Sequence, residues 1–433
     1  MSVTKTTKIE VPILARVEGE GALDIEIENN EIKKCELRIY EPPRYFEKFL
    51  EGREPNEIID AVARICGICP LAYQTAAAQA MEQVFGIEIS PWAKDMRLLM
   101  MLGQWIHSQY LHVHLLAAPD FLGYRSGIEM AKDYPNEVLR GVRLQHLGND
   151  IMKLLGGRSV HPNGVKLGGF WSSPKESTVK AFIPRLEAAL KDAKEVIEFV
   201  AKLPFPDTTI PFKQVSLRHP TEYPVIASGV ITSDGEEFDI ADWEHHFKEF
   251  HAPQSTALHS TTLDDKPILL GPLPRLNLNF DRLPKHIQDM ANATGITFPS
   301  NNMFHSVVAR AIEGYWAIER ALEICQAYTY TDTPSAPEQY AAGSAWAAVE
   351  APRGIQIDKF DFDAQGKATH IRISAPTSQN LPCMEADLRI ALKNFGLDRP
   401  NHELQLHAEM VVRNYDPCIS CSAHFLTLNV VRN

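Results

Sequence analysis

Long uninterrupted hydrophobic runs are absent from this sequence. Residues 1–10 are polar, lack the apolar centre of a signal peptide and carry no twin-arginine pair. The most apolar long stretch, 98–118, is interrupted by Gln, Ser and His side chains, so it predicts a buried helix and no membrane span. We therefore expect a cytoplasmic protein, with export on the signal of a partner as the alternative.

Basic residues are also fewer than acidic ones. The 433 residues include 43 Lys and Arg against 55 Asp and Glu, which gives a formal net charge of −12, and the basic residues form no run. An acidic surface repels a phosphate backbone, so we expect no nucleic-acid partner. The hydrophobic share of 45% is ordinary for a globular protein, and the length allows an extensive core.

Cysteine is scarce, and seven residues in a chain of this size exclude a disulfide framework. Four of the seven form two Cys-x-x-Cys pairs near opposite ends of the chain: Cys66 with Cys69, and Cys418 with Cys421. The other three are scattered and are predicted to be small core side chains: Cys35, Cys325 and Cys383.

Hydrophobic periodicity predicts a mainly α fold with peripheral β-structure, of the α+β class. Alternating residues around Asn29-Asn30 predict an N-terminal β-hairpin within 8–40. Helices are expected over 56–85 (broken near Gly67 and Pro70), 92–117, 173–202, 307–328 and 385–395, a strand–turn–strand unit over 354–375, and short strands with loops over 203–300. Because no linker or repeat is present, residues 1–433 are expected to form one unit.

The spacing of the cysteines suits a metal ion. Two thiols three residues apart can face one side of a turn, and four thiolates complete a soft ligand set. Closing the loop of about 350 residues between the pairs costs roughly 5 kcal/mol. Structural metal binding supplies about 10–16 kcal/mol, so a shared centre is feasible. From the cysteines alone, a structural zinc site is an open alternative.

The residues around the cysteines indicate which kind of metal site they form. Five segments occur in order: Ala-Arg-Val-Glu-Gly at 15–19, Arg-Ile-Cys-Gly-Ile-Cys-Pro at 64–70, Glu-Ala-Pro-Arg-Gly at 350–354, Pro-Thr-Ser-Gln-Asn at 376–380, and Asp-Pro-Cys-Ile-Ser-Cys-Ser-Ala-His at 416–424. Over almost its whole length the sequence therefore resembles the large, catalytic subunit of nickel–iron hydrogenases. The resemblance implies the fold of that subunit, a core of long helices, and the reaction H2 ⇌ 2 H⁺ + 2 e⁻.

The same resemblance implies roles for the four cysteines. Cys66, Cys69, Cys418 and Cys421 would bind nickel, and thiolates suit that metal. Cys69 and Cys421 would also bridge to an iron that carries carbon monoxide and cyanide. Cys66 and Cys418 would be terminal ligands.

Heterolytic cleavage of hydrogen also needs a base. The resemblance offers Cys418 and Arg353, but the pKa of an arginine exceeds 12, so electrostatic positioning is the alternative role for Arg353. Glu18 matches the proton-relay carboxylate of the family; the alternative is a surface glutamate on a strand.

Other residues match positions around the cluster. Asp416 is expected to orient the cysteine loop, or else to shape a turn. Thr377 or Ser378, with the backbone near Pro352, are expected to donate hydrogen bonds to the cyanides, with an ordinary turn hydroxyl as the alternative.

A second metal site is implied near the C-terminus. Glu47 and His424 match residues that hold a Mg2+ (or Fe2+) ion in the family. Residues 425–433 would then be a C-terminal extension that an endopeptidase removes, or an ordered strand. Three histidines on the predicted helix 92–117 are expected to be core groups and not ligands: His107, His112 and His114.

Departures from the family pattern indicate a branch. Tyr73 stands where many members have histidine, and Ser108 where many have a carboxylate. The segment 70–74 resembles the cytoplasmic, NAD(P)-linked branch that includes the sulfhydrogenases.

Electrons must leave through partners, because no cysteines remain for iron–sulfur clusters and no Gly-x-Gly-x-x-Gly fingerprint is present. The resemblance implies an iron–sulfur small subunit, flavin-containing diaphorase subunits and a maturation chaperone. Three alternative functions compete with that of a hydrogenase: a structural zinc protein, a hydrogen-sensing subunit, and a quinone-module subunit of a related respiratory complex. Subunits of the last kind generally lack the four cysteines.

Overall fold

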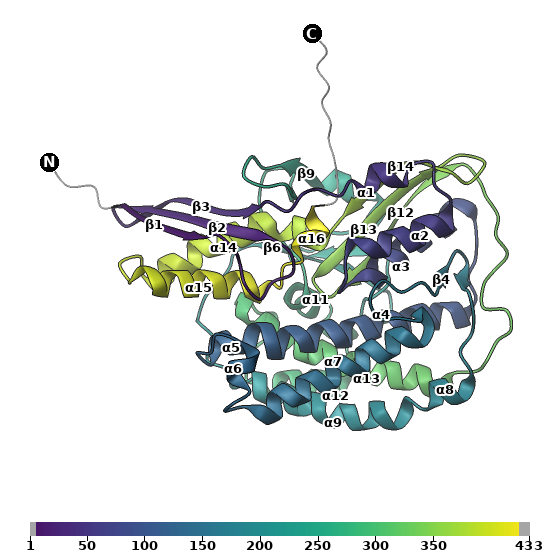
Figure 1. Ribbon diagram of the computed structural model, residues 1–433, viewed down its shortest axis with the longest axis horizontal. Coiled ribbons are helices and arrows are strands. Elements are labelled where there is room, and N and C mark those ends of the chain that lie inside the picture. Colours follow the sequence, from purple (N-terminus) through teal and green to yellow (C-terminus); the bar gives the residue numbers. More distant parts are fainter. Residues whose placement is uncertain (1–5, 424–433) are drawn as a thin grey trace, which may run out of the picture.

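The computed structural model describes residues 6–423 and arranges them in two layers (Figure 1). Long helices form one layer, and small sheets with further helices, among them α14 (Pro376–Phe395), form the other. The mainly helical α+β class predicted from the sequence is confirmed. No helix among these residues has the length and apolar character needed to cross a membrane.

The helical layer is built from four long helices. They are α4 (Pro91–Leu111), α7 (Pro135–Gly156), α9 (Ile183–Val200) and α13 (Ser306–Ala327). α4 begins at a serine cap, since the Ser90 side chain accepts from the Ala93 N–H, and it continues as the π-helical turn η2 (His112–Ala117). It crosses α7 at close range: a Cβ on Gly148 would lie 2.4 Å from the backbone nitrogen of His107. Glycine is therefore required at this crossing.

Three antiparallel strands form the N-terminal sheet, in the order β1 (Thr6–Val11), β2 (Gly21–Glu28) and β3 (Glu31–Ile39). The predicted hairpin is confirmed as β2–β3, with β1 added at its edge. Asn29 and Asn30 have φ values of 49° and 64°, the left-handed conformation that a two-residue hairpin turn requires.

A second antiparallel sheet lies next to the helix that follows the first cysteine pair. Its strands are β12 (Gly343–Ala351), β13 (Gly354–Phe362) and β14 (Ala368–Ser374), and they confirm the strand–turn–strand unit expected over 354–375. The residues before and after that pair form α2 (Pro55–Val62), η1 (Ala63–Ile65) and α3 (Pro70–Phe85), so the helix expected over 56–85 breaks where predicted. α3 packs on β12 and β13.

The remaining elements complete the fold. The helices are α1 (Phe46–Leu50), α5 (Ala118–Phe121), α6 (Gly127–Met130), α8 (Glu176–Lys180), α10 (Trp243–His246), α11 (Pro272–Leu278), α12 (Lys285–Asn292), α14 (Pro376–Phe395), α15 (Asn401–Asn414) and α16 (Ile419–Ser422). The strands are β4 (Val165–Lys166), β5 (Gly169–Phe170), β6 (Lys213–Arg218), β7 (Gly229–Thr232), β8 (Glu237–Asp239), β9 (Phe247–His251), β10 (Leu258–Thr262) and β11 (Ile268–Leu269).

Two predicted helix boundaries are wrong. The helix expected over 173–202 is two helices, α8 and α9, which separate near Pro184 because proline lacks the N–H that a continuous helix needs. The helix expected over 385–395 is the second half of α14, which passes through Pro382. The sequence pattern also does not predict α7 and α15, which contain a smaller share of apolar residues than the helices α4, α9 and α13.

Candidate metal centre

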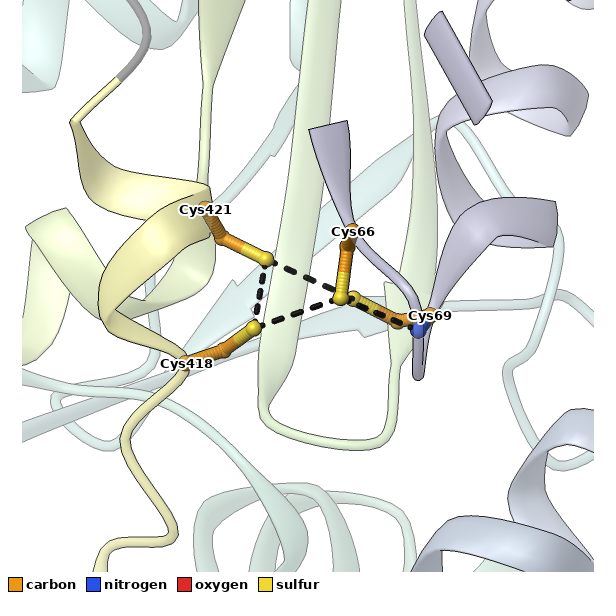
Figure 2. Close-up of side chains that lie close together, drawn as sticks. All are labelled: Cys66, Cys69, Cys418 and Cys421. Atoms are coloured by element: carbon orange, nitrogen blue, oxygen red, sulfur yellow. Dashed lines mark hydrogen bonds between the residues drawn. The ribbon is translucent and has the colours of Figure 1, made fainter. Parts of the chain in front are cut away.

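The four motif cysteines meet in one buried cluster (Figure 2). Their sulfur atoms all lie within 4.8 Å of one another, although the two pairs come from opposite ends of the chain. Cys66 Sγ is 3.3 Å from Cys418 Sγ, and Cys69 Sγ is 3.6 Å from Cys421 Sγ. The convergence that the sequence predicts is therefore present in the fold.

The first pair is positioned by helical ends. Cys66 follows η1, and Cys69 is the residue that precedes α3, with Pro70 in its first turn. The backbone N–H groups of Ile68 and Cys69 donate to Cys66 Sγ at 3.3 and 3.1 Å. These donors and the N-terminus of α3 stabilise negative charge on the sulfur atoms.

The second pair is held by the segment between β1 and β2. The N–H of Glu18 donates to the carbonyl of Pro417 at 3.4 Å, and the N–H of Ile419 donates to the carbonyl of Glu18 at 2.9 Å. The N–H of Cys418 donates to Thr377 Oγ1 at 2.9 Å. Residues near both chain ends thus fix the short helix α16 that carries Cys421.

One arginine joins the two cysteine loops. Arg44 donates to the carbonyls of Arg64 and Ile65 at 3.1 and 2.7 Å, and to the carbonyl of Ser420 at 2.6 Å. Its own N–H donates to the carbonyl of Ala423 at 3.2 Å. Sequence reasoning gave this arginine no role, because nothing in its spacing from the cysteines signals the contact.

The four thiols do not ionise alike. Burial alone would raise the pKa of Cys66, yet hydrogen bonds with the other three thiols and the charge of Arg353 hold it well below its ordinary value. Burial raises the pKa values of Cys418 and Cys421 well above the ordinary one. Because each further thiolate adds like charge to a buried space, a cation among the sulfur atoms is the natural counter-charge. The donor set fits a thiolate-bound metal centre.

Glu18 is in contact with the second pair. It lies in the loop between β1 and β2 and not on a strand, and its Oε2 accepts from Cys418 Sγ at 3.0 Å and from the N–H of Ser420 at 3.1 Å. Burial, and then the negative charge of Cys66, raise the pKa of Glu18. A partly buried carboxyl with a raised pKa takes up a proton more readily than an exposed one.

Arg353 and Asp416 form a buried pair beside the cluster. Arg353 Nε donates to the carbonyl of Asp416 at 2.7 Å, and Nη2 donates to its Oδ1 at 3.0 Å. Burial alone would lower the pKa of Arg353, but Asp416 and the thiolates raise it well above the ordinary value. In this setting the guanidinium keeps its proton.

Comparison with known proteins identifies the family. The chain is 31% identical to the alpha subunit of sulfhydrogenase 1 from Pyrococcus furiosus over 424 residues, which cover 97% of this chain and 98% of that protein. This chain belongs to the nickel-dependent hydrogenase family. The prediction of a large catalytic subunit that acts on hydrogen is thereby confirmed, and the structural zinc alternative is set aside.

Further matches agree with this result. Residues 44–135 match the family described as nickel-dependent hydrogenase. The alpha subunit of sulfhydrogenase 2 from Pyrococcus furiosus is 29% identical, with 97% of this chain and 100% of that protein covered. The structure of an NAD+-reducing [NiFe]-hydrogenase in the H2-reduced state superposes with a TM-score of 0.84 at 24% identity, covering 96% of this chain and 99% of the other. The large-subunit fold of this hydrogenase is therefore established.

Two hydroxyls predicted to lie near the cluster differ in their contacts. Thr377 Oγ1 accepts from Cys418 and its own hydrogen is free to donate elsewhere, whereas Ser378 Oγ donates to the carbonyl of Ala375 within α14 at 2.7 Å. Thr377 is thus the better-placed donor of the two. The carbonyl of Pro352 accepts from Arg310 Nη1 at 3.4 Å, so this part of the backbone is also engaged.

The predicted second metal site is described only in part. Glu47 lies in α1, and its Oε1 accepts from the N–H of Ile373 at 2.7 Å. Burial raises the pKa of neighbouring Glu249 to about 7, with the charge of Glu47 adding to the shift. His424 and the segment 425–433 lie outside the described residues, so the structure describes only Glu47 of the two predicted ligands. Glu249 was not predicted from the sequence.

The three helix histidines lie in the core, as predicted. Burial lowers the pKa values of His107, His112 and His114 to about 4, 3 and 4, so their rings are neutral at physiological pH. None belongs to the four-cysteine group found among residues 6–423. The three scattered cysteines, Cys35, Cys325 and Cys383, are buried as expected.

Proposed function

We propose that this hydrogenase chain exchanges the electrons of hydrogen with NAD(P) in the cytoplasm, by way of flavin-containing diaphorase subunits and an iron–sulfur small subunit. The observation that carries the reaction is the buried cluster of four thiols within 4.8 Å of one another. The NAD(P) link is supported by the likeness to an NAD+-reducing hydrogenase and to the alpha chain of a sulfhydrogenase. An electron-carrying partner is required because the three remaining cysteines are isolated.

The cofactor would be a nickel–iron centre whose iron carries carbon monoxide and cyanide. When bound, it accepts the electron pair of hydrogen and returns it as single electrons. The four thiolates would hold nickel, and Cys69 and Cys421, which face each other across the cluster, would also hold iron. The hydroxyl of Thr377 would donate to a cyanide. Ser378 and the backbone at Pro352 would line the same side of the cluster.

Proton transfer would use Cys418 and then Glu18. The 3.0 Å contact between Cys418 Sγ and Glu18 Oε2 lets a proton pass from sulfur to carboxylate without rearrangement. The raised pKa of Glu18 makes its carboxylate a better proton acceptor than an exposed glutamate. Arg353, which keeps its proton, would act as a fixed positive charge beside the cluster, held by Asp416.

A divalent cation would be held by Glu47 and His424. The crowding of Glu47 with two buried carboxylates supports this assignment, because burial raises the pKa values of Glu249 and Asp358 and the charge of Glu47 raises them further. A Mg2+ ion would offset this negative charge with oxygen ligands. The segment 425–433 would be removed by an endopeptidase after a chaperone-assisted assembly, and 1–433 would act as one unit until then.

The first test is an infrared spectrum of the complex purified from its native host. We expect bands in the carbon monoxide and cyanide stretching region that shift under hydrogen, with one nickel per copy of this chain. Zinc alone, with no such bands, would overturn the cofactor assignment. Fast dye reduction under hydrogen is expected of an enzyme; slow turnover with an intact cluster would indicate a hydrogen sensor instead.

A further inference from the structure

Two buried arginines share a single carboxylate beside the cluster. Arg353 Nη2 donates to Asp416 Oδ1 at 3.0 Å, while Arg310 Nη1 lies 3.2 Å from Asp416 Oδ2. All three side chains are at most 2% exposed. Each carboxylate oxygen thus faces its own guanidinium: Oδ1 accepts a hydrogen bond from Arg353, and Oδ2 forms an ion pair with Arg310 without a hydrogen bond.

Arg310 also reaches the turn that carries Arg353. The same nitrogen, Nη1, donates to the carbonyl of Pro352 at 3.4 Å and to Gln109 Oε1 at 2.7 Å. Pro352 and Arg353 are the two residues between β12 and β13. A single side chain from α13 therefore contacts the hairpin turn, the first residue of the second cysteine motif (Asp416), and α4.

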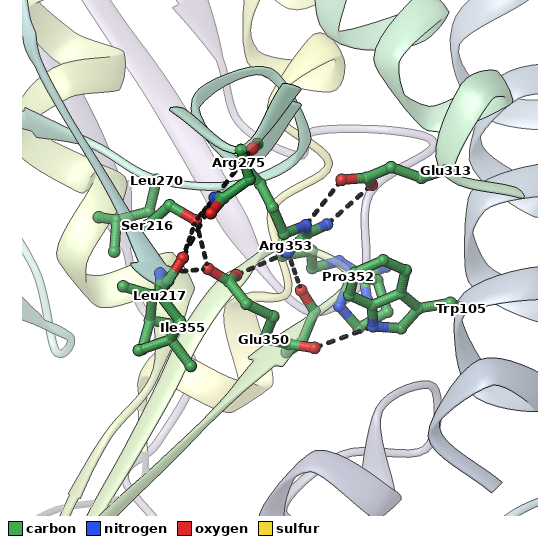
Figure 3. Close-up of polar contacts among 12 residues, drawn as sticks. Trp105, Ser216, Leu217, Leu270, Arg275, Glu313, Glu350, Pro352, Arg353 and Ile355 are labelled. Atoms are coloured by element: carbon green, nitrogen blue, oxygen red, sulfur yellow. Dashed lines mark hydrogen bonds and ion pairs between the residues drawn. The ribbon is translucent and has the colours of Figure 1, made fainter. Parts of the chain in front are cut away.

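A buried ionic network reaches Arg310 through Gln109, and Figure 3 draws Arg275, Glu313 and Glu350 of this network. Gln109 Nε2 donates to Glu313 Oε2 at 2.7 Å, and Glu313 also accepts from Arg275 Nε at 2.7 Å. Arg275 Nη1 donates to Glu350 Oε2 at 2.6 Å and to the carbonyl of Ala351 at 2.9 Å. Glu350 and Ala351 end β12, so the network supports both the turn and the arginine that touches it.

Electrostatics agrees with a role as a fixed charge. Burial lowers the pKa of Arg310 to about 10, with Asp416 opposing the change and Arg353 adding to it. The side chain is therefore still protonated at neutral pH. A second positive charge this close to Arg353 is tolerated because Asp416 lies between the two.

We propose that Arg310 is a positioning residue, which holds Asp416 and the Pro352 carbonyl so that the guanidinium of Arg353 stays fixed beside the thiolate cluster. The proposal rests on the role assigned to Arg353 above. Arg310 itself touches no cysteine among its described contacts, so it acts through Arg353 and not on the reacting atoms.

The test is a double-mutant cycle between positions 310 and 353. Arg310→Met and Arg353→Lys are made singly and together in the complete hydrogenase complex, and kcat and KM for hydrogen are measured with a dye. We expect Arg310→Met to lower kcat roughly tenfold or more with KM little changed, and the double variant to be no slower than Arg353→Lys alone. Arg310→Lys, which keeps the charge, should recover part of the rate.

Three readouts separate positioning from a general structural effect. Nickel and iron content and the melting temperature show whether each variant is folded and loaded, and the cyanide bands in the infrared show whether the charge beside the cluster has moved. Arg97→Lys is the matched control, because Arg97 is an equally buried arginine whose bidentate pair with Glu82 lies in another part of the protein. It should lower the melting temperature, leave kcat unchanged and leave the cyanide bands in place.

The possible outcomes are distinct. Independent, multiplicative losses from Arg310→Met and Arg353→Lys would overturn the proposal, as would an unchanged kcat in loaded Arg310→Met protein. A normal rate in Arg353→Lys would overturn the role of Arg353 as well. If Arg310→Met protein does not take up metal, the cycle is run with Gln109→Met, which loosens Arg310 but keeps its charge; it should show the same dependence on Arg353, and independent losses would again contradict the proposal.

Discussion

The two Cys-x-x-Cys pairs differ in what surrounds their sulfur atoms. The first pair faces backbone N–H donors and the N-terminus of the 16-residue helix α3, and the pKa of Cys66 is held well below its ordinary value. The second pair faces the carboxyl of Glu18, and the pKa of Cys418 is raised. Hydrogen bonding with Cys418 raises the pKa of Cys69 as well, so the contrast lies between Cys66 and Cys418. Identical spacing gives one sulfur whose thiolate is stabilised and another whose thiol donates to Glu18.

The largest expected effect comes from removing the proton-accepting sulfur. Cys418→Ala should abolish hydrogen uptake and sharply lower nickel content, because it removes both a ligand and the base. Metal analysis and dye reduction under hydrogen measure these losses, with circular dichroism as the check on folding. Cys325→Ala, a buried cysteine outside the cluster, should keep full activity. Activity retained by folded Cys418→Ala protein would rule out this ligand.

Glu18→Gln sharpens the comparison, since it removes the carboxyl that accepts from Cys418. Loss of the carboxyl should slow hydrogen oxidation roughly 100-fold or more, because the proton on Cys418 loses its acceptor. Nickel content should stay normal, which separates a relay from a ligand role. Glu41→Gln is the control: Glu41 accepts from Ser420 Oγ at 2.9 Å but contributes no contact to the cluster sulfurs. Equal losses in the two variants would contradict the relay.

Arg44→Met should loosen the junction between the pairs. Charge-assisted hydrogen bonds contribute about 1.5–3 kcal/mol each, so losing the contacts to Ile65 and Ser420 should speed nickel release to a chelator at least tenfold. The release rate at fixed chelator concentration is the measurement. Arg158→Met, which removes a single contact to the carbonyl of His161, should release nickel at the normal rate.

The smallest expected effect concerns the buried His114 and the pH dependence of stability. Burial lowers the pKa of His114 in the folded protein to about 4, below its ordinary value of 6.5. The unfolded chain therefore binds an extra proton between these two values, so stability is full above pH 6.5 and falls as the pH drops toward 4. His114→Gln should reduce the loss of unfolding free energy between pH 8 and 5.5 by about 1.4 kcal/mol. An unchanged pH dependence of unfolding would show that the ring is not kept neutral.

The sequence predicts the parts of this protein that obey local rules. Asn29-Asn30 marks its hairpin because both residues accept positive φ, and the cysteine motifs mark the metal cluster because their flanks are specific. The helix predicted over 385–395 covers only the second half of α14. A proline inside a helix ordinarily breaks it, whereas here tertiary packing keeps the helix continuous through Pro382.

Residues that act only through tertiary contacts could not be found in this way. Arg44 and Arg310 lie far in sequence from the loops they hold, and neither has a signature that separates it from a surface arginine. Glu249 is similar: it lies on a short strand, and only the fold brings it beside Glu47.

The distance in sequence between the cysteine pairs determines when, during translation, the four thiols can come together. About 350 residues separate Cys69 from Cys418, and translation at about 5–20 residues per second needs roughly 20–70 s to cover them. During this interval the first pair exists as a reactive dithiol without its partners. The four-thiol site can therefore form only after the second pair has been synthesised.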